Sequence, residues 1–145
     1  KALGFAGARC GAVAGPAAVV RMLGAVQAPY ALATPVVECV EDALQADQLE
    51  AARAAVAETV AERQRLANAL ANYDFVSKVW PSDANFLLVR VDDAPGVMRH
   101  CESHKVLLRH FGGDLHDCIR ISIGAPSEND SLLMALDALK DTSDD

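Results

Sequence analysis

The chain opens on the stretch Lys1-Ala2-Leu3-Gly4-Phe5-Ala6-Gly7-Ala8-Arg9-Cys10-Gly11, which sets one lysine and one arginine among small and apolar residues. Small side chains let the backbone come close to a bulky ligand. A lysine amine can bond covalently to a carbonyl compound, and an arginine is a fixed cation that suits a phosphate. On these residues alone, two interpretations stay open: a cofactor site, or a surface loop with an ordinary lysine and a paired arginine.

Length and composition indicate one domain's worth of chain without a nucleic-acid or membrane partner. The 145 residues are 52% hydrophobic but only 5% aromatic, so burial is expected to rest on Ala, Val and Leu. The net charge is −7, and no cluster of Lys and Arg is present, which argues against nucleic acid or an anionic membrane surface. No apolar run reaches the roughly 18 residues that a membrane span requires.

The cysteines favour a reducing compartment. Cys10, Cys39, Cys101 and Cys118 are widely spaced and form no Cys-x-x-Cys pair. This spacing favours a set of free thiols in the cytoplasm over a disulfide framework. We therefore expect a cytoplasmic protein.

The first part of the chain is predicted to be mostly helical. Gly15-Pro16 predicts a turn, with Pro16 as the first residue of a helix that continues to about Gly24. Thr34-Pro35 predicts a second helix, in which Thr34 is the N-cap and the proline follows at the first helical position.

Residues 47–72 are predicted to form one long helix. Apolar residues recur there at steps of three and four while most charged residues stay off that stripe, and six alanines between residues 51 and 61 favour a helix. At 1.5 Å per residue the helix would be roughly 40 Å long, more than the width of a small domain. Such a helix usually bridges two bodies, with a bundle or coiled coil as the alternative. The stripe consists of Leu49, Ala52, Val56, Val60, Ala67 and Leu70.

After Tyr73 the pattern becomes that of strands and short helices. We expect an α/β fold in which residues 1–46 and the long helix at 47–72 lead to a small α+β domain, 73–145, with a mostly antiparallel sheet. The expected order is strand 75–80, strand 85–91, a helix capped by Asp93 that ends near His104, strand 106–111, strand 118–123, and a last helix after a capping box at 127–130.

Two arginines stand in the predicted strands. In Cys118-Ile119-Arg120-Ile121-Ser122-Ile123 the three isoleucines share one face, so Arg120 points to the opposite face, which is either solvent or a cleft. Arg109 lies in the apolar run with Leu107 and Phe111, where an arginine requires a partner.

These stretches resemble the fold-type I aminotransferases that use pyridoxal phosphate (PLP), and within them the histidinol-phosphate aminotransferases. The resemblance implies the carboxy-terminal portion of such an enzyme, beginning at its PLP lysine, with the acidic partner of the pyridine nitrogen and most of the phosphate cradle upstream. It rests on five stretches in the family's order: Phe5–Gly11, Ala28–Val36, Asp83–Arg90, Leu107–Arg109 and Cys118–Gly124.

The resemblance also implies roles for individual residues. Lys1 would carry the cofactor and act as the general base, and Arg9 would bind the cofactor phosphate. Arg120 would bind the substrate carboxylate, and Arg109 would hold the anionic tail of the substrate, a phosphate or a distal carboxylate.

The roles of four further residues remain open. Tyr30 and Asn85 are candidates for the substrate site, with a half-buried core tyrosine and a turn residue as the alternatives. His100 and His104 lie four apart on a predicted helix and could form a metal pair, but no acidic companion stands at a motif position. We therefore expect surface histidines and no metal.

By resemblance, the intact enzyme is a cytoplasmic homodimer that transfers an amino group in histidine biosynthesis. It would interconvert glutamate and 2-oxoglutarate with imidazole-acetol phosphate and L-histidinol phosphate through PLP, and this chain by itself would be inactive. An aromatic amino-acid aminotransferase or a threonine-phosphate decarboxylase of the same branch is the alternative, as is a non-catalytic α/β fragment.

Overall fold

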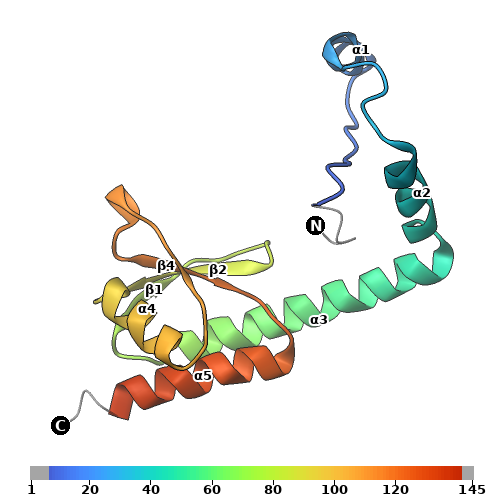
Figure 1. Cartoon of the computed structure of the whole chain (residues 1–145). Coiled ribbons are helices and arrows are strands. Elements are labelled where there is room, and N and C mark those ends of the chain that lie inside the picture. The colour runs from blue at the N-terminus through green and yellow to red at the C-terminus, as the bar shows by residue number, and fades with distance from the viewer. Residues whose placement is uncertain (1–6, 142–145) are drawn as a thin grey trace. The chain divides into compact units, whose positions relative to one another are not determined.

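The computed structural model describes residues 7–141 of the chain, which divides into two compact units, residues 1–56 and 57–145 (Figure 1). The predicted α/β fold with a mostly antiparallel sheet is confirmed, because all strand pairs are antiparallel. The first unit is helical, and the second contains the sheet.

The two helices predicted in the first unit are present as α1 (Ala17–Val26) and α2 (Thr34–Ala43). The cap of α1 lies one position later than predicted, and the cap of α2 lies one position earlier. Pro16 is the N-cap of α1 rather than its first residue, and Ala33 is the N-cap of α2, so that Thr34 is already helical. The carbonyls of Pro16 and Ala33 accept the first hydrogen bonds of the two helices, which fixes these starts.

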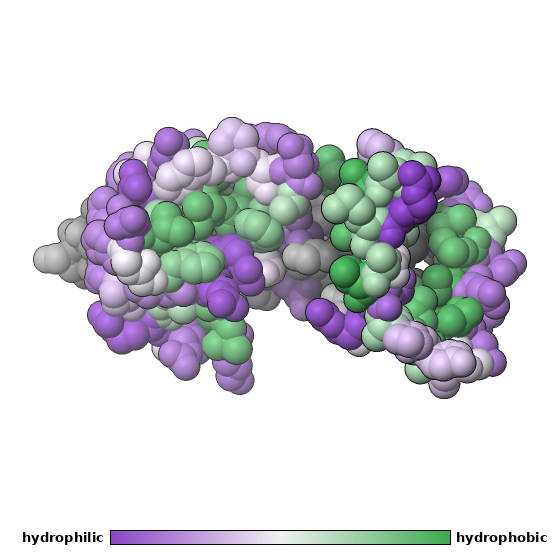
Figure 2. Space-filling view, turned by 90° about the horizontal axis from the view of Figure 1, so that it is seen from above, coloured by the Kyte–Doolittle hydropathy of each residue, from purple (hydrophilic) through white to green (hydrophobic). Residues whose placement is uncertain are grey.

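The first unit has no core among the residues that the structure describes. Neither α1 nor α2 has a buried residue, and nothing described before Leu66 is buried. Large apolar side chains such as Met22 and Leu23 are exposed instead. Green, hydrophobic side chains are accordingly visible on the surface in the right-hand part of Figure 2.

The long helix predicted at 47–72 is α3 (Ala46–Leu70), and the boundary between the two units falls within it. Of its predicted apolar stripe only Leu70 is buried, in the second unit together with Leu66, whereas Val56 is 42% exposed. None of the described helices is long and apolar enough to cross a membrane. That α3 bridges two bodies stays a prediction.

The second unit is built on one four-stranded sheet. The strands lie in the order β1 (Val76–Val79), β2 (Phe86–Val91), β4 (Cys118–Ser122) and β3 (Arg109–His110). One face of the sheet packs on the carboxyl end of α3, on α4 (Ala94–Ser103) and on α5 (Pro126–Asp141), and these elements together form the core. This unit also contains the short η1 (Gly113–Leu115).

The strand predicted at 106–111 is much shorter in the structure, since β3 contains only Arg109 and His110. The backbone N–H of Val106 donates to the carbonyl of Cys101 at the end of α4, 2.9 Å away. This bond holds the start of the segment 106–108 against α4, so these residues do not pair with β4. Leu107 is therefore 81% exposed.

The helix caps of the second unit agree with the prediction in one case and differ in the other. The Asp93 side chain accepts from the backbone N–H of Gly96 at 2.9 Å and caps α4, as predicted. At α5 the Glu128 carboxylate accepts from the N–H of Ala125 at 2.8 Å. That cap thus begins before the predicted box at 127–130, because α5 already starts at Pro126.

The structure describes all four cysteines, and each is free. Cys101 is fully buried, and burial raises the pKa of its thiol to about 11. The pKa of the Cys118 thiol is also raised, first by burial and then by the hydrogen bond to Asp117. Cys39 is exposed.

We therefore predict a large difference in thiol reactivity. At about pH 8 a water-soluble disulfide reagent should label Cys39 about 100-fold faster than Cys101 or Cys118, because only an exposed thiolate is a good nucleophile. Mass spectrometry of labelled peptides measures the three rates, and the same experiment in urea is the control, in which the rates should converge. Equal labelling in the folded state would contradict the burial of these two thiols.

Candidate anion-binding site

One face of the sheet packs on the core, and we call the opposite face the open face. A row of paired residues on the open face consists of Leu88, Arg120 and Arg109. Arg120 is the register partner of Leu88 on one side and of Arg109 on the other. Directly paired residues of neighbouring strands project from the same face of a sheet. Ile119 and Ile121 are buried on the core face, so Arg120 lies on the opposite face, as its sequence pattern predicts.

Arg120 is placed to receive an anion. Its guanidinium carbon lies 5.2 Å from the centre of the Phe86 ring. Its Nε atom is buried and has no hydrogen-bond partner among the described residues. A buried N–H without an acceptor is unfavourable, so an oxygen of a bound ligand would satisfy it.

Arg109 differs from the prediction in its surroundings. It is exposed at the edge strand, with its guanidinium carbon 5.7 Å from the centre of the Phe111 ring. The expectation that it needs a partner in an apolar environment is therefore wrong, because the short strand leaves it in water. Its position opposite Arg120 places two like charges on paired residues, an arrangement that an anion would stabilise.

A third arginine on this face is already neutralised. Arg90 precedes Val91 at the end of β2, and its Nε lies 2.8 Å from Oδ2 of Asp117. The pKa of Asp117 is held below its usual value, first by the Cys118 thiol and also by Arg90. Sequence analysis did not single out Arg90 or Asp117, although the alternation of β2 places Arg90 on the open face with Leu88. Arg109 and Arg120, by contrast, form no ion pair with a described carboxylate.

Asn85 lies beside this face. It is exposed immediately before β2, and its backbone carbonyl accepts from the N–H of Ile123 at 2.9 Å. Because Phe86 then pairs with Ser122, Asn85 stands at the end of the sheet that follows Arg120 along β4. Asn85, Arg109 and Arg120 thus belong to one sheet: Arg109 and Arg120 lie on paired strands, and Asn85 precedes the strand on the other side of β4.

The other predicted site residues belong to the first unit. Lys1 lies outside the described residues. Arg9 is exposed with a φ of 53°, and Tyr30 is fully exposed with a φ of 56°. Such left-handed backbone is uncommon for residues other than glycine. Tyr30 is therefore not buried among the described residues, and the roles expected of Tyr30 and Arg9 stay predictions.

The histidines are occupied by backbone contacts. The Nε2 atom of His100 lies 2.8 Å from the carbonyl of Ala135, and Nδ1 of His104 lies 3.0 Å from the carbonyl of His100. Within residues 7–141, no group of three or more His, Cys, Asp or Glu side chains is arranged to hold a metal ion.

A hydrogen-bonded cluster on α3 and α5 holds the end of β4. Asn129 is 2% exposed, and its Nδ2 donates to Oε2 of Glu62 at 2.7 Å and to the carbonyl of Gly124 at 2.9 Å. Its Oδ1 accepts from the N–H of Gly124 at 3.0 Å. Arg65 bridges Glu62 and Asp130 at 2.7 and 2.8 Å. Sequence analysis placed Asn129 only within a helix cap, because a single sequence does not show that its side chain turns toward α3.

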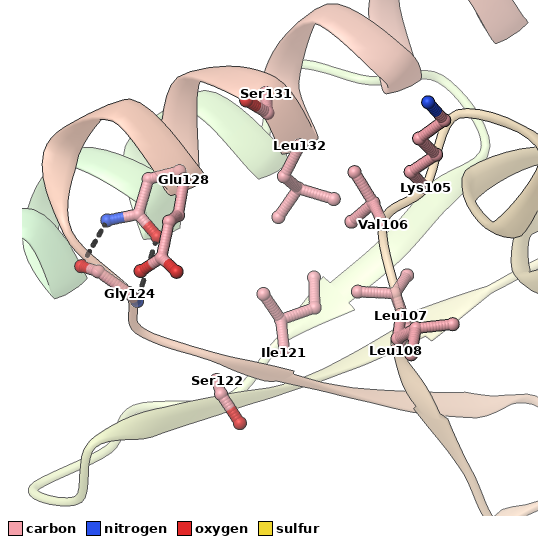
Figure 3. Close-up of a pocket in the computed structure, with 11 residues that line it drawn as sticks. Lys105, Val106, Leu107, Leu108, Ile121, Ser122, Gly124, Glu128, Ser131 and Leu132 are labelled. Atoms are coloured by element: carbon pink, nitrogen blue, oxygen red, sulfur yellow. Dashed lines mark hydrogen bonds between the residues drawn. The ribbon is translucent and has the colours of Figure 1, made fainter.

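A separate cavity of about 350 Å³ opens next to this cluster (Figure 3). Ile121 and Leu132 point into it from β4 and α5, and the segment at 105–108 forms its opposite wall. Ser122 points away from it in Figure 3. Since Arg120 shares the face of Ser122 rather than that of Ile121, this cavity is not part of the arginine face.

Comparison with known proteins shows the family to which this chain belongs. The family model for aminotransferase class I and II matches residues 1–139. The chain is 41% identical over 138 residues to the histidinol-phosphate aminotransferase of Xylella fastidiosa, which covers 94% of this chain and 38% of that protein. The chain therefore spans about two-fifths of the length of this curated relative.

Solved structures agree with this similarity. The crystal structure of a putative aminotransferase from Burkholderia pseudomallei superposes with a TM-score of 0.85 at 34% identity, covering 97% of this chain and 42% of the other. The histidinol-phosphate aminotransferase of Sinorhizobium meliloti, solved in complex with pyridoxal-5'-phosphate, has a TM-score of 0.76 at 23% identity, covering 98% of this chain and 39% of that one. At that identity the second match shows a common fold.

The Glu62 carboxylate of the cluster generates a prediction about pH. Its pKa is held below the usual 4.5, first by the hydrogen bond from Arg65 and then by that from Asn129. A carboxylate with a lowered pKa in the folded state stabilises the fold above the pKa of the unfolded state, and this contribution is lost as the pH falls through the folded value. Glu62→Gln should therefore lower the urea midpoint near pH 7, and the difference from wild type should shrink below about pH 4.

Glu58→Gln is the matched control, because Glu58 is exposed on the same helix. It should change the midpoint little at either pH. A deficit of Glu62→Gln that persisted unchanged in acid would contradict the role of the Glu62 charge.

Proposed function

Because this chain belongs to the aminotransferase class I and II family, we propose that the whole protein is a PLP-dependent histidinol-phosphate aminotransferase. In this reaction an amino group moves between glutamate and imidazole-acetol phosphate, which yields 2-oxoglutarate and L-histidinol phosphate. The identity to the Xylella fastidiosa protein supports the choice of substrate. The observation that carries the proposal is the buried Nε of Arg120, which has no hydrogen-bond partner within residues 7–141 and lies beside Arg109 on one sheet face.

The pair of arginines suits both substrates of such an enzyme. Glutamate carries two carboxylates, and the phosphorylated substrate carries a phosphate of about −1.5 to −2 charges near neutral pH. Arg120 can bind the α-carboxylate of glutamate through its planar fork while Arg109 takes the distal carboxylate. The phosphate of the second substrate would then use the same cationic face.

The cofactor would be held by residues of the first unit. Arg9 is exposed and would bind the cofactor phosphate, and Lys1 would hold the cofactor covalently and move a proton at the substrate Cα. Bound PLP supplies an electron sink for the negative charge that develops at that carbon. We assign Tyr30 and Asn85 to the substrate site as well, since both side chains are exposed.

The proposal extends to a homodimer in the cytoplasm. The four free cysteines are consistent with a reducing compartment. The exposed apolar side chains of α1 and α2 support an assembly that covers them, because large apolar patches seldom stay in contact with water.

The substrate is tested on the whole protein loaded with PLP. Consumption of L-histidinol phosphate with 2-oxoglutarate should be faster than transamination of phenylalanine, and threonine phosphate should not be decarboxylated. Faster turnover of phenylalanine, or release of carbon dioxide from threonine phosphate, would replace the proposed substrate. The 145-residue chain alone serves as a control and should be inactive, since the acidic partner of the cofactor ring nitrogen is assigned to none of its residues.

Arg120→Lys tests the carboxylate site. Lysine keeps the charge but loses the two-pronged fork, so the interaction should weaken by about 1.5–3 kcal/mol, or roughly 10- to 150-fold in the dissociation constant for glutamate. PLP retention, measured by visible absorbance after dialysis, should stay unchanged.

Arg90→Lys is the control for that variant, because Arg90 lies on the same face but is already paired with Asp117. It should leave glutamate binding nearly as in wild type. Loss of PLP from the Arg120→Lys variant, with glutamate affinity intact, would show that Arg120 serves the cofactor instead.

A further inference from the structure

Two strand ends that flank Arg120 are tied to the same part of α3. Nη1 of Arg63 donates to the carbonyl of Ala84 at 2.9 Å, just before β2 begins. Next to Arg63 along the helix, Glu62 and Arg65 form the cluster that holds Asn129 against Gly124, just after β4 ends. The ends of the two central strands are thus both anchored to one rigid element.

Asn129 uses its whole amide in this anchor. It is the buried polar side chain of the described core, and it bonds both the N–H and the carbonyl of Gly124. The bond to Glu62 fixes the orientation of the amide, because only the nitrogen can donate to a carboxylate. Without this amide, the backbone groups of Gly124 would lose their partners inside the protein.

The anchor is connected to Arg120 by short steps along two paired strands. Gly124 lies two residues after Ser122, the last residue of β4, and Ser122 is the register partner of Phe86. The Phe86 ring is the surface on which the Arg120 guanidinium lies. A shift of the β4 end relative to β2 would therefore move the arginine relative to the ring beneath it.

We propose that Asn129 is a positioning residue for the carboxylate site: by pinning Gly124 to Glu62 of α3, it fixes the place of Arg120 on the open face of the sheet. This inference rests on the proposed function of Arg120. Misplacing a reacting group by about 1 Å can slow a reaction by up to about 100-fold, so an anchor that fixes the strand carrying Arg120 can affect the site without touching the ligand.

A double-mutant cycle on the whole, PLP-loaded protein tests the proposal, with maleate as a dicarboxylate that carries no amino group to transfer. Asn129→Ala should weaken maleate binding about 10-fold, measured by calorimetry, while PLP retention is unchanged. In the Arg120→Ala background the same change should weaken binding less than about 2-fold, because Asn129 acts through Arg120.

Two controls separate positioning from stability. Tyr73→Phe removes a different contact to α5, the 2.7 Å hydrogen bond to Oδ1 of Asp137, and should lower stability without affecting maleate. Glu58→Gln removes an exposed charge from the same helix, outside the anchor, and should bind maleate nearly as wild type does. If Asn129→Ala does not fold, Asn129→Ser keeps an oxygen near Gly124 and should show a smaller loss of the same kind.

The outcomes distinguish this inference from the proposed function. If Arg120→Ala leaves maleate binding unchanged, the function proposed for Arg120 fails, and the positioning role fails with it. If Arg120→Ala weakens binding but the Asn129 variants do not, only the positioning role is overturned. An equal loss from Asn129→Ala in both backgrounds would also overturn it, since it would reflect a general loss of structure.

Discussion

The double pairing of β4 is the constraint on which the second unit depends. With β2 on one side and β3 on the other, β4 cannot rotate, so its alternation sends Ile119 and Ile121 into the core and Arg120 to the opposite face. The same hydrogen-bonded ladder therefore builds the core and orients the candidate site. Burial of the isoleucines keeps the arginine in place, because a slip by one residue would exchange the two faces.

Asp117 neutralises one of the three arginines on the open face. Asp117 pairs with Arg90, and neither Arg109 nor Arg120 forms an ion pair with a carboxylate in the described part of the chain. Like charges on directly paired residues of adjacent strands repel each other, which supports the proposal that this face binds an anion. The aromatic rings of Phe86 and Phe111 lie against these guanidinium groups and favour their positive charge without neutralising it.

The two units differ in whether their described residues form a hydrophobic core. The second unit has a continuous core that runs from α3 through the sheet to α4 and α5. The first unit has helices of the predicted type but no buried residue in α1 or α2. Local helix signals are sufficient to form such segments, whereas their packing requires a surface that the described residues of this unit do not supply.

Local pattern in the sequence determined the helices, the strands and the face of Arg120, because a period of two or of 3.6 residues can be seen in one segment at a time. The tertiary structure decided what depends on segments far apart in the chain. It shortened β3 by bonding Val106 to α4, paired Arg90 with Asp117, and turned the Asn129 amide from a helix start toward Glu62, 67 residues away. Hydrogen bonds and ion pairs of this kind leave no period in the sequence, since each joins residues whose nearness is created only by folding.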